Sequence, residues 1–130
     1  MRIAVKEVGK PLRIVETDKK YRSECCQDFV DNDIVQFVYL NDNRTFAFGI
    51  DEDGLMKQLP LNFLISTNHP YQPIQFIVGT AVFVRVKYVN PYEEEIWDFE
   101  VEDLLDEDLE EIKELLSEER QMFLKVHSRK

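Results

Sequence analysis

The sequence is poor in the residues that stabilise secreted proteins. Only two of its 130 residues are cysteine, and these two, Cys25 and Cys26, are adjacent. A disulfide between neighbours is strained, so no disulfide framework is expected. A reducing compartment, and therefore a cytoplasmic location, is the simplest expectation.

Long hydrophobic runs are missing as well. Residues 1–10 lack the apolar run of a secretory signal peptide. The most apolar stretch, residues 74–89, is interrupted by Gly79, Arg85 and Lys87 and falls short of the ~20 apolar residues that span a bilayer. No membrane partner is expected.

The residues of nucleophilic catalysis are scarce. The sequence has only two histidines, His69 in a polar loop and His127 near its end. A pair formed by His69 with Cys25 or Cys26 would have the right residue types for a base and a nucleophile, but no cysteine-hydrolase motif surrounds them. Helix packing explains the cysteines better, and no catalytic residue is assigned.

Motifs for metals and phosphates are also absent. There is no C-x-x-C, H-E-x-x-H or glycine-rich phosphate loop. If Asp51 and Asp53 were ligands of an EF-hand loop, Gly49 would occupy its first position and Pro60 its twelfth, and neither can ligate calcium. The sequence predicts no enzyme activity, no metal and no cofactor.

What the sequence does have is apolar content and negative charge. Apolar residues make up 44% of it, which is enough for the core of one domain over residues 1–130. The formal net charge is -10, with 26 acidic against 16 basic residues. This balance argues against direct nucleic-acid binding and favours a basic partner.

Alternating apolar residues and turn residues predict an α+β fold with a twisted, mainly antiparallel sheet. The short helix is expected from the i, i+4 spacing of apolar side chains. The expected elements are a hairpin over residues 2–16, a helix over 21–30, a hairpin over 34–50, strands over 74–78 and 81–89, and an edge strand over 92–101.

The strongest helical pattern covers residues 106–126, which contain no glycine or proline. Apolar residues recur here at intervals of three, four and seven residues, at Leu109, Ile112, Leu116 and Phe123. One long amphipathic helix with these side chains buried is therefore expected. Acidic residues at its start and Lys125 near its end suit the helix dipole.

The negative charge is concentrated in residues 93–120, which hold 15 acidic and two basic residues. Two interpretations remain open: a solvated helix face that only confers solubility, or a surface that binds a basic partner. In the second interpretation six glutamates form the partner-binding set: Glu93, Glu94, Glu95, Glu107, Glu110 and Glu111.

A second candidate site lies near the turn over residues 51–54. Asp53, Asn62 and Tyr71 flank turns and a proline in this region, and aromatic side chains with polar edges are common in ligand grooves. These three residues are the candidates for binding a small ligand. Core or sheet packing is the alternative role for the aromatic residue.

Several segments together resemble a known family. The first lies within residues 43–62, where a strand is followed by the turn Asp51-Glu52-Asp53-Gly54 and then by Leu59-Pro60-Leu61-Asn62. The second is Val78-Gly79-Thr80-Ala81, and the third is Asp106-Glu107-Asp108 at the start of the acidic helix. The chain resembles, over about residues 34–116, a family of small uncharacterised proteins of phages, plasmids and other bacterial mobile elements, known only as a domain of unknown function. Where that family more often has Asn at the first turn position, this chain has Asp51.

The resemblance implies a compact α+β fold and a mobile-element origin, and it supplies no catalytic residues. The leading hypothesis is a non-enzymatic accessory protein of a phage or mobile element that acts on a basic host protein through its acidic segment. The alternative is a small-ligand binding module near the turn over residues 51–54, and an enzyme comes third. The oligomeric state stays open.

Overall fold

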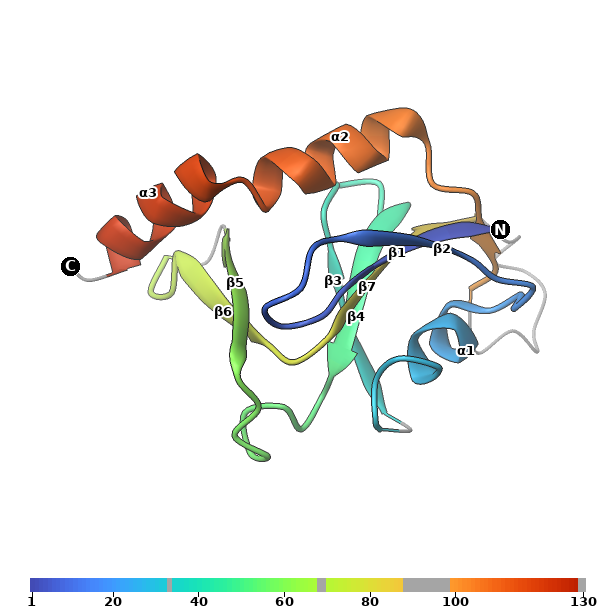
Figure 1. Ribbon diagram of the computed structural model, residues 1–130, viewed down its shortest axis with the longest axis horizontal. Helices are drawn as coiled ribbons and strands as arrows, with labels where there is room; N and C mark the ends of the chain where they lie inside the picture. The colour runs from blue at the N-terminus through green and yellow to red at the C-terminus, as the bar shows by residue number, and fades with distance from the viewer. Residues whose placement is uncertain (33, 68–69, 88–98, 129–130) are drawn as a thin grey trace.

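The described residues of the computed structural model are 1–32, 34–67, 70–87 and 99–128, and they form three layers (Figure 1). A central six-stranded sheet is covered on one face by a short helix and on the other by a β-hairpin and the first of two C-terminal helices, and the second of these helices packs against the hairpin. The strands are β1 (Arg2–Lys6), β2 (Arg13–Glu16), β3 (Val35–Tyr39), β4 (Phe46–Asp51), β5 (Leu61–Ser66), β6 (Ile74–Val78), β7 (Ala81–Val86) and β8 (Val101–Glu102). The helices are α1 (Arg22–Gln27), α2 (Asp106–Leu115) and α3 (Glu118–Ser128). The predicted α+β class is confirmed.

The central sheet is antiparallel, with strand order β2-β1-β7-β4-β3. β1 and β8 share one side of β7: β1 pairs with the first half of β7 and β8 pairs with its end, at Arg85 and Val86. β4 lies on the other side of β7. The two predicted hairpins are confirmed as the β1–β2 and β3–β4 pairs.

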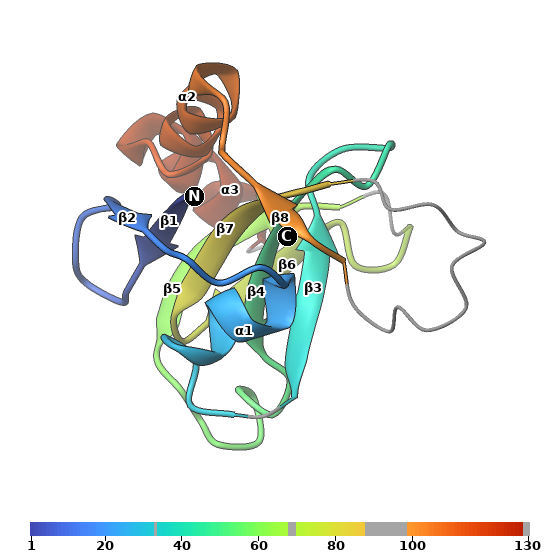
Figure 2. The same cartoon turned by 90° about the vertical axis from the view of Figure 1, so that its right-hand side faces the viewer.

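Both faces of the sheet are buried, which explains why β4 is buried along its whole length. On one face, α1 lies against the sheet (Figure 2), and the valines of β7 pack with Cys25, Cys26 and Val30 from the α1 region. On the other face, Phe48 and Phe83 meet Phe63 of β5, with ring centroids 5.5 Å (Phe48–Phe63) and 6.1 Å (Phe63–Phe83) apart. The alternation of β7 therefore divides its side chains between two cores.

Gly49 of β4 sets how closely α1 approaches the sheet. A Cβ at this position would lie 2.5 Å from Cys26 Sγ and 2.8 Å from Val35 Cγ1. Both distances are below ordinary van der Waals contact, so only glycine allows this packing. The helix predicted over residues 21–30 is confirmed in its central part, with Tyr21 as its N-cap residue.

β5 and β6 form a separate two-stranded sheet rather than joining the central one. The chain turns from β6 into β7 at Gly79, whose φ of +75° is a left-handed conformation that favours glycine. The Asn62 side chain holds this turn, because its Nδ2 donates to Gly79 O and Lys6 O, at 2.8 Å each. The apolar face of the hairpin thereby closes over the phenylalanine cluster.

The long C-terminal helix predicted over residues 106–126 is two helices, α2 and α3. Ser117 separates them: its hydroxyl donates to Glu114 O at 2.8 Å and accepts from the Arg120 N–H at 3.2 Å, so it caps the start of α3. Leu109 and Ile112 are buried as expected and Leu116 is half-buried. The expected burial of Phe123 is wrong, since 53% of this residue is exposed.

The edge strand predicted over residues 92–101 lies mostly outside the described residues. Of that range the structure describes residues 99–101, where Glu100 bridges Tyr21 and Val101 begins β8. Among the described helices, none has the length and apolar character needed to cross a membrane.

Candidate functional site

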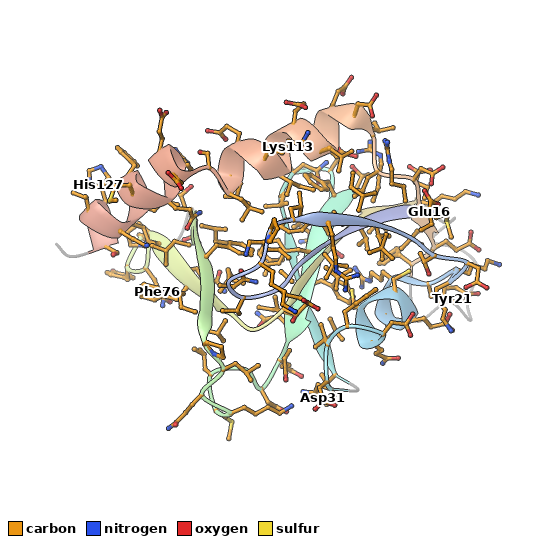
Figure 3. The ribbon with its side chains drawn as sticks, viewed as in Figure 1. Glu16, Tyr21, Asp31, Phe76, Lys113 and His127 are labelled. Atoms are coloured by element: carbon orange, nitrogen blue, oxygen red, sulfur yellow. The ribbon has the colours of Figure 1, made fainter. Side chains whose placement is uncertain are left out.

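The outer face of α2 carries a row of exposed carboxylates, formed by Asp106, Glu107, Glu110, Glu111 and Glu114. Opposite them, Leu109 and Ile112 are buried against the sheet and the β5–β6 hairpin. In Figure 3 the labelled Lys113 marks this helix at the edge of the molecule. The acidic row therefore faces solvent along the full length of α2; we call these five residues the acidic face.

Basic groups neutralise only part of the acidic face. Lys113 Nζ lies 3.6 Å from Glu110 Oε1, and Arg2 Nη2 lies 3.2 Å from Asp106 Oδ1. Among the described residues, no cation is paired with Glu107, Glu111 or Glu114. Glu93, Glu94 and Glu95, the other predicted partner-binding residues, lie outside the described residues.

The first turn of α2 is fixed to the sheet by a buried carboxylate. Asp108 is 5% exposed and contacts Arg85 Nη1 of β7 through both its oxygens, at 3.0 and 3.1 Å. Asp108 Oδ2 also accepts from the Leu105 N–H at 2.8 Å, which satisfies one of the free donors at the helix start. The acidic face is thus presented on a helix held at its N-terminal end.

A second polar cluster surrounds Asp51, at the end of β4. Asp51 is 6% exposed; its Oδ1 accepts from Asn32 Nδ2 at 2.6 Å and from the Asp53 N–H at 2.8 Å, and its Oδ2 lies 2.8 Å from Lys57 Nζ. Lys57 also donates to Asp31 O at 3.0 Å. This network ties the α1–β3 loop to the turn after β4.

The Asp51 network shifts the pKa values of its charged members. Burial raises the pKa of Asp51, but the hydrogen bonds from Asn32, Lys57 and the Asp53 N–H together outweigh burial and leave this pKa below its usual value. The hydrogen bond to Asp51 raises the pKa of Lys57. Both groups are therefore charged over the whole physiological pH range.

An apolar cavity of about 310 Å³ opens beside this network. Asp31, Asp51 and Lys57 form its polar side, and its other walls, which are mostly apolar, are Val8, Phe29, Val30, Leu59, Pro60, Gly79 and Thr80. A larger hollow of about 470 Å³ lies between the β3–β4 turn, the β5–β6 hairpin and the end of α2. The first combines apolar walls with a fixed charged pair, the usual composition of a small-molecule site.

The three predicted ligand-binding residues have separate positions. Asp53 accepts from Asn32 Nδ2 at 3.1 Å and belongs to the Asp51 network. Asn62 lies at the open end of the β5–β6 hairpin, where its side chain supports the Gly79 turn and its Oδ1 is buried without a hydrogen-bond partner among the described residues. Tyr71 is 91% exposed in the turn at the other end of that hairpin.

The centre of this cluster could not be predicted from the sequence. Asp51 has the pattern of a turn residue there, and no motif marks Asn32 or Lys57. Asn32 and Asp51 are 19 residues apart, so only the packing of α1 against β4 brings them together. The one available signal was Asp51 itself, a charged residue directly after the apolar residues 46–50.

The structure offers little for metal or nucleophilic chemistry among the residues it describes. In these residues, no group of three or more His, Cys, Asp or Glu side chains could hold a metal ion. Cys25 and Cys26 are both buried, and His69 lies outside the described residues. His127 packs edge-on against Phe123 on α3, with ring centroids 4.0 Å apart.

One comparison with known proteins identifies a family. A family model described as a domain of unknown function (DUF3846) matches residues 1–117, which include every described strand and α1 and α2. The match therefore extends through β1, β2 and α1, ahead of the segment that carries the resemblance in the sequence. No curated protein and no solved structure matches the chain.

Proposed function

We propose, starting from the fact that this chain belongs to the DUF3846 family, that it is a non-enzymatic accessory protein of a phage or other mobile element. In this proposal it acts on a basic host protein, which it binds through the acidic face of α2. The observation that carries the proposal is a row of exposed carboxylates on a helix anchored through Asp108, in which Glu107, Glu111 and Glu114 have no paired cation among the described residues.

The spacing of the row favours recognition by an extended set of basic groups. Glu107, Glu111 and Glu114 follow one another at intervals of four and three residues, so each is about one helical turn, ~5.4 Å, from the next. Side chains at this spacing lie on the same side of a helix. Several lysines or arginines of a partner can therefore be contacted at once.

Exposed charges such as those of the acidic face mainly affect how fast and how specifically a partner binds. An exposed ion pair contributes only about 0 to 1 kcal/mol, and the field of the acidic face decays over ~8 Å at physiological salt. A partner held by it should consequently bind faster at low salt and be released as salt rises.

The proposal is tested first with a defined basic probe, a fluorescent oligolysine peptide. The triple variant Glu107→Gln, Glu111→Gln, Glu114→Gln removes the three charges of the acidic face that have no paired cation among the described residues. The matched control Asp18→Asn, Glu24→Gln, Glu52→Gln removes three exposed charges from other surfaces. We expect the first variant to bind the peptide about tenfold more weakly than the control, since three lost pairs at about 0.5 kcal/mol each amount to roughly 1.5 kcal/mol. Equal binding by the two variants would mean that only net charge matters.

A second candidate function rests on the cavity beside Asp51 and Lys57. Its apolar walls and fixed charged pair support a small-ligand site, with Lys57 and Asp51 orienting a polar group of the ligand. A thermal-shift screen of small metabolites tests it. A hit should raise the melting temperature of the wild type with little salt dependence and should not stabilise Thr80→Trp, a variant designed to fill the cavity.

A further inference from the structure

Helix α3 is apolar on two opposite sides. Leu124 is 2% exposed, whereas Met122, Phe123 and Val126 are 62%, 53% and 54% exposed. Met122 and Val126 are each two residues from Leu124, which in an α-helix places them about 160° around the axis from it. A surface helix with one partner needs only one apolar side, so the outer side of α3 has the composition of a second contact surface.

The outer side of α3 is held in place by polar contacts on its inner side. The Gln121 side chain accepts from the Leu64 N–H at 2.9 Å and donates to Leu64 O at 3.0 Å and to Leu115 O at 2.8 Å. It thereby bonds both backbone groups of one residue of β5, as a neighbouring strand would. α3 extends away from the central sheet (Figure 1) and begins directly after the residues that the family model matches.

We propose that the chain self-associates through this surface, with α3 of one copy packed antiparallel against α3 of a second copy. Met122, Phe123 and Val126 form the apolar centre of the contact. The contact depends on apolar side chains of α3 and not on the carboxylates of α2, so the inference is independent of the proposed function, although Glu114 and Phe123 border one shallow hollow.

Charge complementarity selects a second copy in this orientation. Glu118 and Lys125 are both exposed, and no ion pair is recorded for either among the described residues. They are seven residues apart, which places both on the same flank of the helix, ~10.5 Å apart along its axis. An antiparallel pair with its two-fold axis near Met122 brings Glu118 of each copy against Lys125 of the other. In a parallel pair the same flank of the two copies would lie on opposite sides of the seam, so Glu118 and Lys125 would not meet.

The size of the contact surface on α3 sets the expected affinity of the dimer. α3 has 11 residues and is therefore only ~16 Å long. A helix pair of this length buries less than the ~1,200 Å² of a standard stable interface, so a weak, concentration-dependent dimer is expected. Because a two-fold axis relates the two copies, both contact surfaces are used within the dimer and no third copy can bind in the same way.

The test is sedimentation equilibrium of the full chain over a wide concentration range, with circular dichroism and melting curves to verify that each variant is folded. Met122→Glu should weaken dimerisation at least about tenfold. Met56→Glu, at a position 87% exposed on another surface, is the matched control and should leave it unchanged.

Charge reversal then tests the orientation. Glu118→Lys and Lys125→Glu should each weaken the dimer, and the double variant should restore it, because opposite charges face each other again. A wild type that stays monomeric at all concentrations overturns the proposal. So does a dimer that is insensitive to Met122→Glu, or single reversals that are not rescued by the double variant.

Discussion

Arg85 of β7 and Asp108 of α2 form a three-centre contact, in which Arg85 Nη1 lies 3.0 Å from one carboxylate oxygen of Asp108 and 3.1 Å from the other. The Arg85 side chain is 22% exposed and that of Asp108 is 8% exposed. This contact joins the strand at the middle of the sheet to the first turn of the helix that carries the acidic face. The position of the acidic face therefore depends on an ion pair that is largely shielded from water.

Replacing Asp108 should destabilise the fold measurably. Asp108→Ala removes the carboxylate that pairs with Arg85 Nη1 and accepts from the Leu105 N–H, and an unpaired polar group at a largely buried site costs about 1 to 3 kcal/mol. Urea denaturation should show a loss of stability in this range. Glu102→Ala is the control: it removes the other carboxylate near Arg85, which is 48% exposed, and should cost under ~1 kcal/mol. Equal losses in the two variants would contradict this assignment.

The Asp51 network should make stability depend on pH. The pKa of Asp51 is lower in the folded protein than its usual 3.8, so its contribution is complete above that value and is lost as the pH falls through the folded pKa. The pKa of Lys57 is raised above its usual 10.5, so its contribution is present below that value and is lost at more alkaline pH.

Lys57→Met tests both directions. The difference in urea midpoint between wild type and this variant should be largest between about pH 5 and 9. It should shrink as the pH falls through the lowered pKa of Asp51 and as the pH rises through the raised pKa of Lys57. Lys113→Met removes an exposed lysine whose ion pair is on the surface and should show no comparable pH dependence. In Lys57→Met, a difference that stays constant from below the pKa of Asp51 to above that of Lys57 would argue against the network.

Adding one methyl group at Gly49 should also destabilise the fold. Gly49→Ala places a Cβ within 2.5 Å of Cys26 Sγ and 2.8 Å of Val35 Cγ1, and overpacking of this kind costs about 1 to 3 kcal/mol. Shortening the neighbouring side chain with Cys26→Ala should recover part of that loss. A double-mutant cycle measures the coupling, and simple additivity of the two substitutions would show that the two positions are not in tight contact.

Much of the fold could be predicted because local patterns agree with it. Alternation over residues 34–50 and 81–86 and the Gly9 and Asn41–Asn43 turns specify hairpins and strands within a few residues. The division into two sheets could not be predicted, because it depends on the long-range contacts of Asn62 with Lys6 and Gly79. The helix break at Ser117 was missed because the apolar spacing continues across it.

Of the candidate sites, too, only the one defined by local spacing could be predicted from the sequence. The acidic face follows from spacing alone, since an apolar inner side of α2 forces Glu107, Glu110 and Glu111 outward. The Asp51 network required Asn32 and Lys57 to be brought together by packing, and periodicity carries no information on such contacts. The prediction that Asp53, Asn62 and Tyr71 share one groove relied on proximity in sequence, while the hairpin places Asn62 and Tyr71 at its opposite ends.

The most direct test of the proposed function is capture of partners from a bacterial lysate at low and high salt. Three baits are compared: the wild type, the triple variant of the acidic face and the control variant with three charges removed elsewhere. We expect a basic host protein that is retained by the wild type and the control at low salt, and is lost from the triple variant and from every bait at high salt. Recovery of the same proteins by all three baits, or of none that responds to salt, would contradict a role for the acidic face in binding.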